Sequence, residues 1–142
     1  MTQPNETAAS IGSNRGIGLG IAQAMNDGDL PRLLSFLAED VEVNEPNEVP
    51  WPGSFKGHTG FQDLLAKIGS RLLVEILRVD VFEGLDGLLA VRMHARFTSQ
   101  ATDRSIESSV AEVHEIRDGL VHRTDVFYKE PRLVAELFAD GH

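Results

Sequence analysis

The sequence predicts an α+β domain, in which three N-terminal helices pack on a curved, mostly antiparallel sheet around one internal pocket. Helical periodicity dominates the first half of the chain, and a period of two dominates residues 72–128. The two kinds of segment are separated along the chain and do not alternate as in a βαβ fold. A curved sheet folded around helices makes a cone, which leaves a pocket between the helices and the concave face.

Length and composition predict a single globular domain. The chain has 142 residues, and 42% of them are hydrophobic, which is enough to bury a core without disulfide bonds. We expect residues 1–15 to form a flexible polar tail and residues 16–142 to form the domain. The sequence has no cysteine and no uninterrupted apolar span of about 18 residues, so a cytoplasmic protein is expected.

The acidic balance of the chain excludes several classes of partner. The formal net charge is −9, which would repel the phosphates of a nucleic acid or of an anionic membrane. We therefore expect neither nucleic acid nor membrane as a partner.

Two helices joined by a tight turn are predicted at the start of the domain. Ile17 and Ile21 lie at helical spacing with the residues that follow, so the first helix should run from about Gly16 to Asn26. Asp29 is a good N-cap for a second helix, whose leucine stripe covers residues 30–37.

The glycines of GSNRGIGLG, residues 12–20, resemble the phosphate-binding fingerprint of short-chain dehydrogenases. That fingerprint follows a buried strand, but the preceding MTQPNETAAS is polar and has no strand pattern. The Tyr-x-x-x-Lys pair of those enzymes is also missing, because Tyr128 is followed four residues later by Arg132. We interpret the glycines as positions where a helix packs closely, and we expect no dinucleotide cofactor.

A short strand is predicted at residues 41–46, followed by a loop at residues 47–57 and a third helix from the cap Thr59 to Gly69. After that helix the pattern changes to four long strands in a meander, and then to a short last helix that Pro131 opens. The predicted strands are residues 72–83, 88–98, 106–117 and 120–128.

The alternation along these strands places ionisable residues on particular faces. Glu112 and His114 share a face whose ends are apolar, which suits a pocket wall. Asp125 is expected to share a pocket face with Val121 and Phe127, again framed by apolar residues. If these carboxyls converge, burial and mutual repulsion would raise at least one pKa towards neutrality.

Arg92 and His94 share a face with Arg96, and two interpretations of that face remain open. It could line the pocket, or it could be a solvent face, because Leu89, Val91, Met93 and Phe97 on the opposite side would form a good core face.

Three segments resemble the SnoaL-like branch of the NTF2-like superfamily, and the likeness covers residues 16–138. They are IAQAMNDGDLPRLLSFLAEDVEVNEP, FKGHTGFQDLLAKI and EIRDGLVHRTDVFY. This family includes ketosteroid isomerases, polyketide cyclases and limonene-epoxide hydrolases. The resemblance implies the cone-shaped fold, a small apolar ligand and a homodimer that pairs through broad sheet faces.

The resemblance also implies roles for individual residues. Glu45 matches the general-base aspartate of ketosteroid isomerases, whereas Ile21 stands where those enzymes have an oxyanion-hole tyrosine. Glu112 falls near a position that holds a protonated aspartate in the isomerases and a histidine in the cyclases. Asp125 matches the acid or base carboxylate of cyclases and epoxide hydrolases.

Arg92 with His94 resembles the Arg-x-Asp pair of the epoxide hydrolases, with histidine in place of aspartate. Either residue could polarise an oxygen or orient a carboxylate. A zinc or iron site from His94, Glu112 and His114 is a weaker alternative, because it lacks a compact ligand spacing.

We therefore expect a cofactor-independent enzyme of isomerase, cyclase or epoxide-hydrolase type. Asp125 would be the principal acid or base, Glu112 or His114 its partner and Glu45 a second base. The expected substrate contacts are Trp51, Phe55, Phe127, Ile21 and Met25. The alternative is a non-catalytic ligand-binding or dimerisation module on the same fold.

Overall fold

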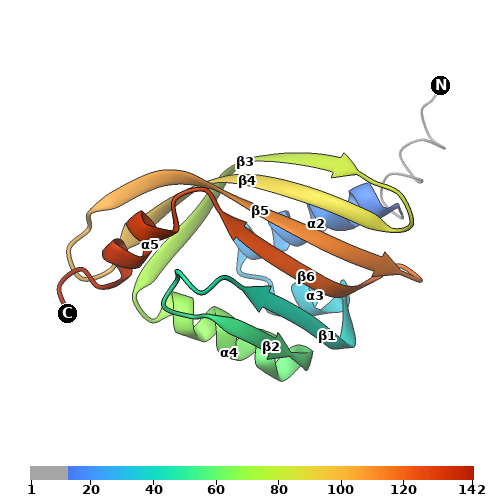
Figure 1. Ribbon diagram of the computed structural model, residues 1–142, viewed down its shortest axis with the longest axis horizontal. Helices are drawn as coiled ribbons and strands as arrows, with labels where there is room; N and C mark the ends of the chain where they lie inside the picture. Colours follow the sequence, from blue (N-terminus) through green and yellow to red (C-terminus); the bar gives the residue numbers. More distant parts are fainter. Residues whose placement is uncertain (1–12) are drawn as a thin grey trace.

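A six-stranded curved sheet forms the frame of the molecule, with strand order β2-β1-β6-β5-β4-β3 (Figure 1). The computed structural model describes residues 13–142. In chain order the elements are α2 (Asn14–Asp27), α3 (Leu30–Ser35), β1 (Leu37–Glu45), β2 (Gly53–Lys56), α4 (Gly57–Gly69), β3 (Leu72–Glu83), β4 (Leu88–Ser99), β5 (Ser105–Arg117), β6 (Leu120–Tyr128) and α5 (Pro131–Phe138). Helix α2 packs on β3 and β4, and α4 packs on β1 and β2.

The first two helices are capped largely as expected. The Asp29 side chain accepts a hydrogen bond from the Arg32 amide, and Gly28 ends α2 in the left-handed region at φ 66°. Helix α2 begins at Asn14, so the expected tail is too long by two residues, and the rest of that prediction lies outside the described residues. The second helix ends at Ser35, so Leu37 of the expected leucine stripe lies in β1 instead.

The glycines of α2 serve close packing, as the sequence predicts. A Cβ added to Gly18 would lie 2.8 Å from Leu89 Cδ2, and one added to Gly20 would lie 2.5 Å from Phe36 Cζ. Both residues lie inside a helix and not in a phosphate-binding turn after a strand. The dinucleotide motif is therefore a helix surface that approaches the sheet and α3.

Strands β1 and β2 differ from the sequence prediction. Strand β1 begins at Leu37 and pairs in parallel with β6, with an irregularity between Leu37 and Glu42. Strand β2, which lies in the expected loop, pairs antiparallel with β1. It was missed because it has only four residues, none of them buried. Helix α4 begins at Gly57 after Lys56, without the expected Thr59 side-chain cap.

The predicted antiparallel meander of β3, β4, β5 and β6 is confirmed. Asp118 and Gly119, both at positive φ, make the tight turn between β5 and β6. One irregularity matters for the site. Ile116 pairs with Val121 but Glu115 pairs with Arg123, so His122 is an extra residue in β6.

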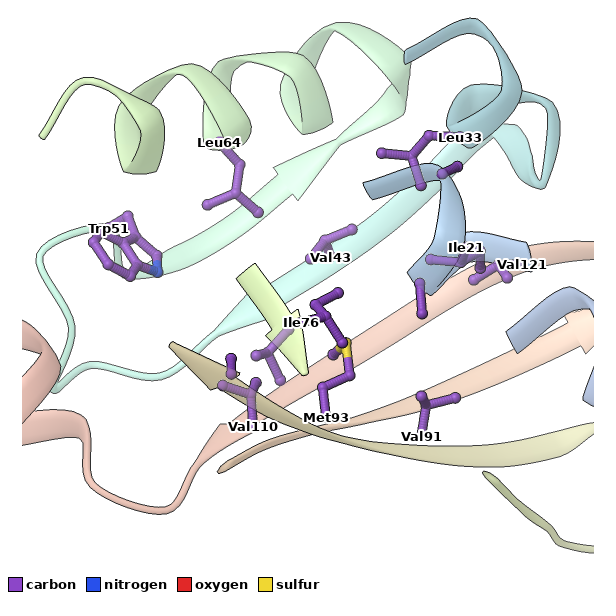
Figure 2. Close-up of a cluster of buried hydrophobic side chains, with 14 of the residues drawn as sticks. Ile21, Leu33, Val43, Trp51, Leu64, Ile76, Val91, Met93, Val110 and Val121 are labelled. Carbon is purple, nitrogen blue, oxygen red and sulfur yellow. The ribbon is translucent and has the colours of Figure 1, made fainter. Parts of the chain in front are cut away.

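The core lies between the concave face of the sheet and the helices (Figure 2). Ile76, Val91 and Met93 point inward from the sheet towards Ile21 of α2 and Leu64 of α4. Among the described residues, no helix is long and apolar enough to cross a bilayer.

We predict that Gly18→Val destabilises the protein by about 1–3 kcal/mol, because the new side chain would overlap Leu89 and Val91 in a packed core. The control is Gln23→Val at an exposed position of the same helix, which introduces the same residue without the overlap. Chemical denaturation measures both. Equal stability of the two variants would contradict the close-packing role of Gly18.

Candidate functional site

A largely apolar cavity of about 430 Å³ lies between the helices and the concave sheet face. Its walls include Ile21 and Met25 from α2, Leu64 and Ile68 from α4, and Ile76 and Met93 from the sheet. This volume is within the usual range for small-molecule sites.

The exposed part of the cavity lining, which we take as its opening, comes from the α2–α3 turn, the end of α4 and the start of β3. Residues at this opening include the exposed Asp29, Gly69 and Val74, all of which contribute to its lining. Asn26 fixes the edge, since its side chain donates to the Ile76 carbonyl and accepts from the Ile76 amide, both at 2.8 Å. The opening is therefore braced against β3 by hydrogen bonds to the backbone.

Five polar side chains gather on one wall of the cavity, where β1, β6 and β5 are neighbours. They are Glu45, Glu112, His114, Thr124 and Tyr128. The pairing of Thr124 with His114 on β5 and with Val43 on β1 places these three strands in register. Side chains at alternate positions of each strand therefore reach the same cavity.

Glu45 is the last residue of β1 and is buried, and its Oε1 atom has no hydrogen-bond partner. Burial raises the pKa of this carboxyl from 4.5 to about 8, and the nearby Glu112 adds to the rise. Hydrogen bonding by Trp51 and Tyr128 acts in the opposite direction but is the smaller effect. Glu45 is therefore largely protonated at neutral pH.

Glu112 lies on β5 and keeps 17% of its side-chain surface accessible, at the cavity wall. Burial raises its pKa to about 7. The two carboxyls thus differ in protonation state near neutral pH: Glu45 holds its proton, whereas Glu112 is partly ionised. That division is what general acid/base chemistry requires.

His114 is almost fully buried beside Glu112. Its Nδ1 lies 2.7 Å from the Thr124 hydroxyl, and its Nε2 lies 3.5 Å from Glu112 Oε1 without a hydrogen-bond partner. Burial lowers the pKa of the imidazole to about 4, so the ring is neutral at pH 7. It can orient Glu112 without adding a positive charge to the cavity.

Tyr128 is a site residue that the sequence analysis missed. Its hydroxyl oxygen accepts a hydrogen bond from Trp51 Nε1 at 3.2 Å, and burial raises its pKa above the ordinary value. Thr124 was missed as well. Strand alternation counted from Val126 could have identified both residues. It places Thr124 and Tyr128 on the same face as Val126, and Arg123, Asp125 and Phe127 on the other.

Asp125 and Phe127 do not line the cavity, which corrects the expectation for both. They lie on the outer face of the sheet, where Phe127 is 55% exposed and Asp125 accepts a hydrogen bond from Asn44 at 2.9 Å. The extra residue His122 changes the alternation after Val121. Counting inward from the turn therefore assigned the wrong face.

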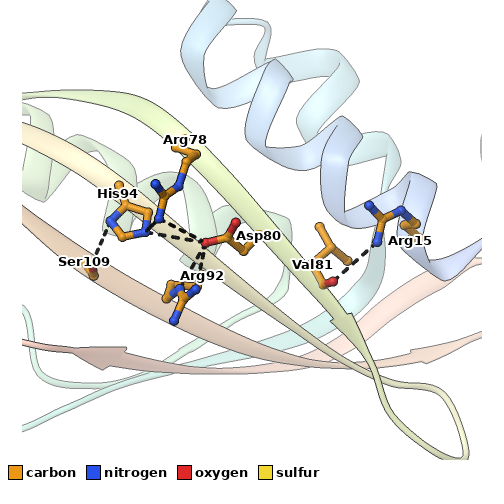
Figure 3. Close-up of polar contacts among 7 residues, drawn as sticks. All are labelled: Arg15, Arg78, Asp80, Val81, Arg92, His94 and Ser109. Carbon is orange, nitrogen blue, oxygen red and sulfur yellow. Dashed lines mark hydrogen bonds and ion pairs between the residues drawn. The ribbon is translucent and has the colours of Figure 1, made fainter.

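Arg92 and His94 also lie on the outer face, so they do not reach the cavity either (Figure 3). Arg92 pairs with Asp80 at 3.0 Å, and His94 lies 3.1 Å from the Ser109 hydroxyl. The alternative interpretation, with Leu89, Val91, Met93 and Phe97 as the core face of β4, is confirmed.

The position of His94 also separates it from Glu112 and His114, which face the cavity. The three proposed ligands of the zinc or iron alternative therefore lie on opposite faces of the sheet and cannot bind one ion. Within residues 13–142, no group of three or more His, Cys, Asp or Glu side chains could hold a metal ion.

The expected substrate contacts divide into two groups. Ile21 and Met25 line the cavity, whereas Trp51 lies behind Tyr128 and Phe55 packs against the core outside the lining. Trp51 therefore supports the polar wall instead of touching a ligand directly.

Comparison with known proteins identifies the fold and the family. The sequence profile of the SnoaL-like domain matches residues 20–124. Similar solved structures include TerC co-crystallised with polyporic acid (TM-score 0.79, 20% identity, 89% of this chain and 98% of that one). An NTF2-like protein of unknown function from Burkholderia pseudomallei has a TM-score of 0.77 at 18% identity, over 85% of this chain and 94% of that one. A protein described as a polyketide cyclase from Pseudomonas putida has a TM-score of 0.75 at 17% identity, over 86% of this chain and 96% of that one. No curated protein matches the sequence.

We predict that Glu45→Gln removes a pH-dependent loss of stability. Because the pKa of Glu45 is 4.5 ordinarily and about 8 in the folded protein, the folded state holds the proton more tightly, and stability falls as pH rises from 4.5 to 8. The variant should therefore match wild type near pH 4.5 and exceed it by about 5 kcal/mol above pH 8, as measured by urea denaturation.

The exposed Glu48→Gln is the control and should follow wild type at every pH. A Glu45→Gln curve parallel to that of wild type would contradict the raised pKa.

Proposed function

We propose that this chain, which belongs to the SnoaL-like domain family of NTF2-like proteins, is an enzyme that performs general acid/base chemistry on an apolar small molecule. One observation carries the proposal: two carboxyls with raised pKa values share a single apolar cavity. Isomerisation, aldol-type cyclisation and epoxide opening all need an acid and a base in such a cavity.

Glu112 is the proposed base and Glu45 the proposed acid. The pKa of Glu112, about 7, is the lower of the two, so Glu112 is the first to ionise. Its negative charge then favours the protonated form of Glu45. We place this chemistry in the cytoplasm, as the sequence predicts. The near-neutral pH there keeps Glu45 protonated while Glu112 is partly ionised.

Tyr128 and His114 support the two carboxyls. The Tyr128 oxygen accepts from Trp51, which leaves the tyrosine proton for a ligand oxygen or for Glu45. His114 is held by Thr124 and faces Glu112, so it acts as a positioning residue. No residue of the outer face takes part in this scheme.

The walls define the kind of substrate that fits. Apart from the polar wall and the opening, the lining consists of aliphatic, methionine and phenylalanine side chains, which favour an apolar body with one or two oxygens. The Pseudomonas relative is described as a polyketide cyclase, which supports including polyketide-like carbonyl compounds among the candidates.

The catalytic proposal predicts proton exchange at carbon next to a carbonyl. Wild type should speed deuterium exchange of an apolar cyclic ketone, measured by NMR, and Glu112→Gln should lower the rate by about 10²–10⁴-fold. The rate should peak between pH 7 and 8, because Glu112 must be ionised and Glu45 protonated.

The matched control is Asp125→Asn, which changes a carboxylate on the outer face and should keep the wild-type rate. If wild type exchanges none of a panel of ketones and opens none of a panel of epoxides, the non-catalytic binding module is the better interpretation.

We also propose that the chain pairs with a second copy through the outer face of the sheet. Leu73, Phe82 and Phe127 are large hydrophobic residues more than half exposed on this face. Ion pairs on the same face combine three arginines with three acidic residues. Asp80 pairs with Arg78 and Arg92, and Arg96 pairs with Glu75 and Glu107. The centre of this face is thus close to neutral although the chain carries −9, so a second copy can approach it.

Sedimentation velocity tests the pairing. Wild type should sediment as a dimer, and Phe82→Asp should shift it towards the monomer, because a charge would be buried in an apolar interface. Leu133→Asp, which places the same charge on the exposed side of α5 and not on the outer face of the sheet, should leave the dimer intact. A monomeric wild type would refute the proposal.

A further inference from the structure

The charges of the cavity have one sign. Three acidic residues contribute to its lining, namely Asp29 at the opening and Glu45 with Glu112 on the polar wall. Neither lysine nor arginine occurs among the lining residues that the structure describes. His114 does not balance them, because its lowered pKa keeps the imidazole neutral.

Two buried polar atoms at the polar wall lack partners. Glu45 Oε1 and His114 Nε2 have no hydrogen-bond partner within residues 13–142. A buried carboxyl oxygen without a donor is unfavourable by about 1–3 kcal/mol, and more when the group is charged. A ligand that donates a hydrogen bond to Glu45 Oε1 would relieve that deficit.

The approach to the cavity favours positive charge as well. Asp29 is exposed at the opening, and the whole chain has a formal net charge of −9. A field of this sign attracts cations and repels anions before any contact is made. The exterior, the opening and the inner wall therefore all favour the same kind of ligand.

We infer that the cavity takes an apolar ligand that carries a protonated amine, with the ammonium group donating to the Glu45 carboxylate and close to Glu112. The inference rests on the cavity assigned in the proposed function and adds lipophilic amines as a class of ligand that it binds. The acid role of Glu45 applies to uncharged substrates, because with an amine bound the ammonium group replaces the Glu45 proton. Neutral ligands lack the ion pair, and carboxylate ligands would meet two acids and no cation.

The number of protons released on binding distinguishes an amine from a neutral ligand. An alkylammonium group ordinarily has a pKa of about 10, above that of either cavity acid, so the proton stays on nitrogen. Glu45, which is protonated in the empty cavity below pH 8, must then release its proton to solvent as the N–H···O bond forms. Binding of an amine near pH 7 therefore releases protons, whereas binding of a neutral alcohol does not.

The other groups that face the ligand do not offset this effect. Asp29 at the start of α3, Glu112 and His114 on β5, and Tyr128 on β6 are the further titratable lining residues. The described lining residues of α2, α4, β3 and β4 carry no ionisable group. Any cation in the cavity must therefore be supplied by the ligand.

The test uses three matched probes, 1-naphthylmethylamine, 1-naphthylmethanol and 1-naphthoate, in calorimetric titrations of the full chain at pH 7. The amine should bind at least about tenfold more tightly than the alcohol, and the carboxylate should bind more weakly than both. Titrations in two buffers with different ionisation enthalpies should show proton release for the amine alone.

Two variants show whether the wall carboxyl is responsible. Glu45→Gln should remove most of the amine's advantage while leaving the affinity for the alcohol within about threefold, and Glu48→Gln should change neither. Equal affinities of amine and alcohol in wild type would overturn the inference, and so would a carboxylate that binds as tightly as the amine or a failure of all three to bind.

These results are separate from the test of catalysis. Amine preference without ketone exchange would support this inference and refute the proposed chemistry. Exchange without amine preference would refute this inference and leave the proposed chemistry in place.

Discussion

The parallel pairing of β1 with β6 is the constraint on which the rest of the site depends. Strands β3 to β6 follow one another as simple hairpins, but β1 is separated from β6 along the chain by the whole meander. Its register, with Val43 beside Thr124, places Glu45 at the polar wall. Any shift of β1 by one residue would turn this carboxyl to the outer face.

The sheet separates two electrostatic environments. On the outer face, arginines and acids form pairs such as Arg92 with Asp80, which water screens and which add little to stability. On the inner face, Glu45 and Glu112 lie among apolar side chains without a cation among the described lining residues. The fold therefore accepts an unfavourable arrangement only in the cavity, which is where a ligand can change its energy.

Most of the fold could be predicted from periodicity, whereas the site could be predicted only in part. Glu112 and His114 were assigned to the pocket because their strand alternates regularly up to those residues, whereas Glu45 was assigned to it by its resemblance to the general-base aspartate of ketosteroid isomerases. Asp125 was assigned to the wrong face because a bulge is invisible to a count based on strict alternation. The face of Arg92 remained open in the sequence because both sides of β4 are plausible, and only the packing of α2 on Leu89 and Val91 decides between them.

The extra residue at His122 also has a consequence for how related chains diverge. Deleting that one codon would restore simple alternation after Val121 and leave Thr124 and Tyr128 in the cavity, with Asp125 and Phe127 still on the outer face. The bulge therefore accommodates one additional residue without changing the lining. A family built on this sheet can thus gain or lose a residue here and keep the same reactive groups, and sequence alignments that misplace this gap will equate residues from opposite faces.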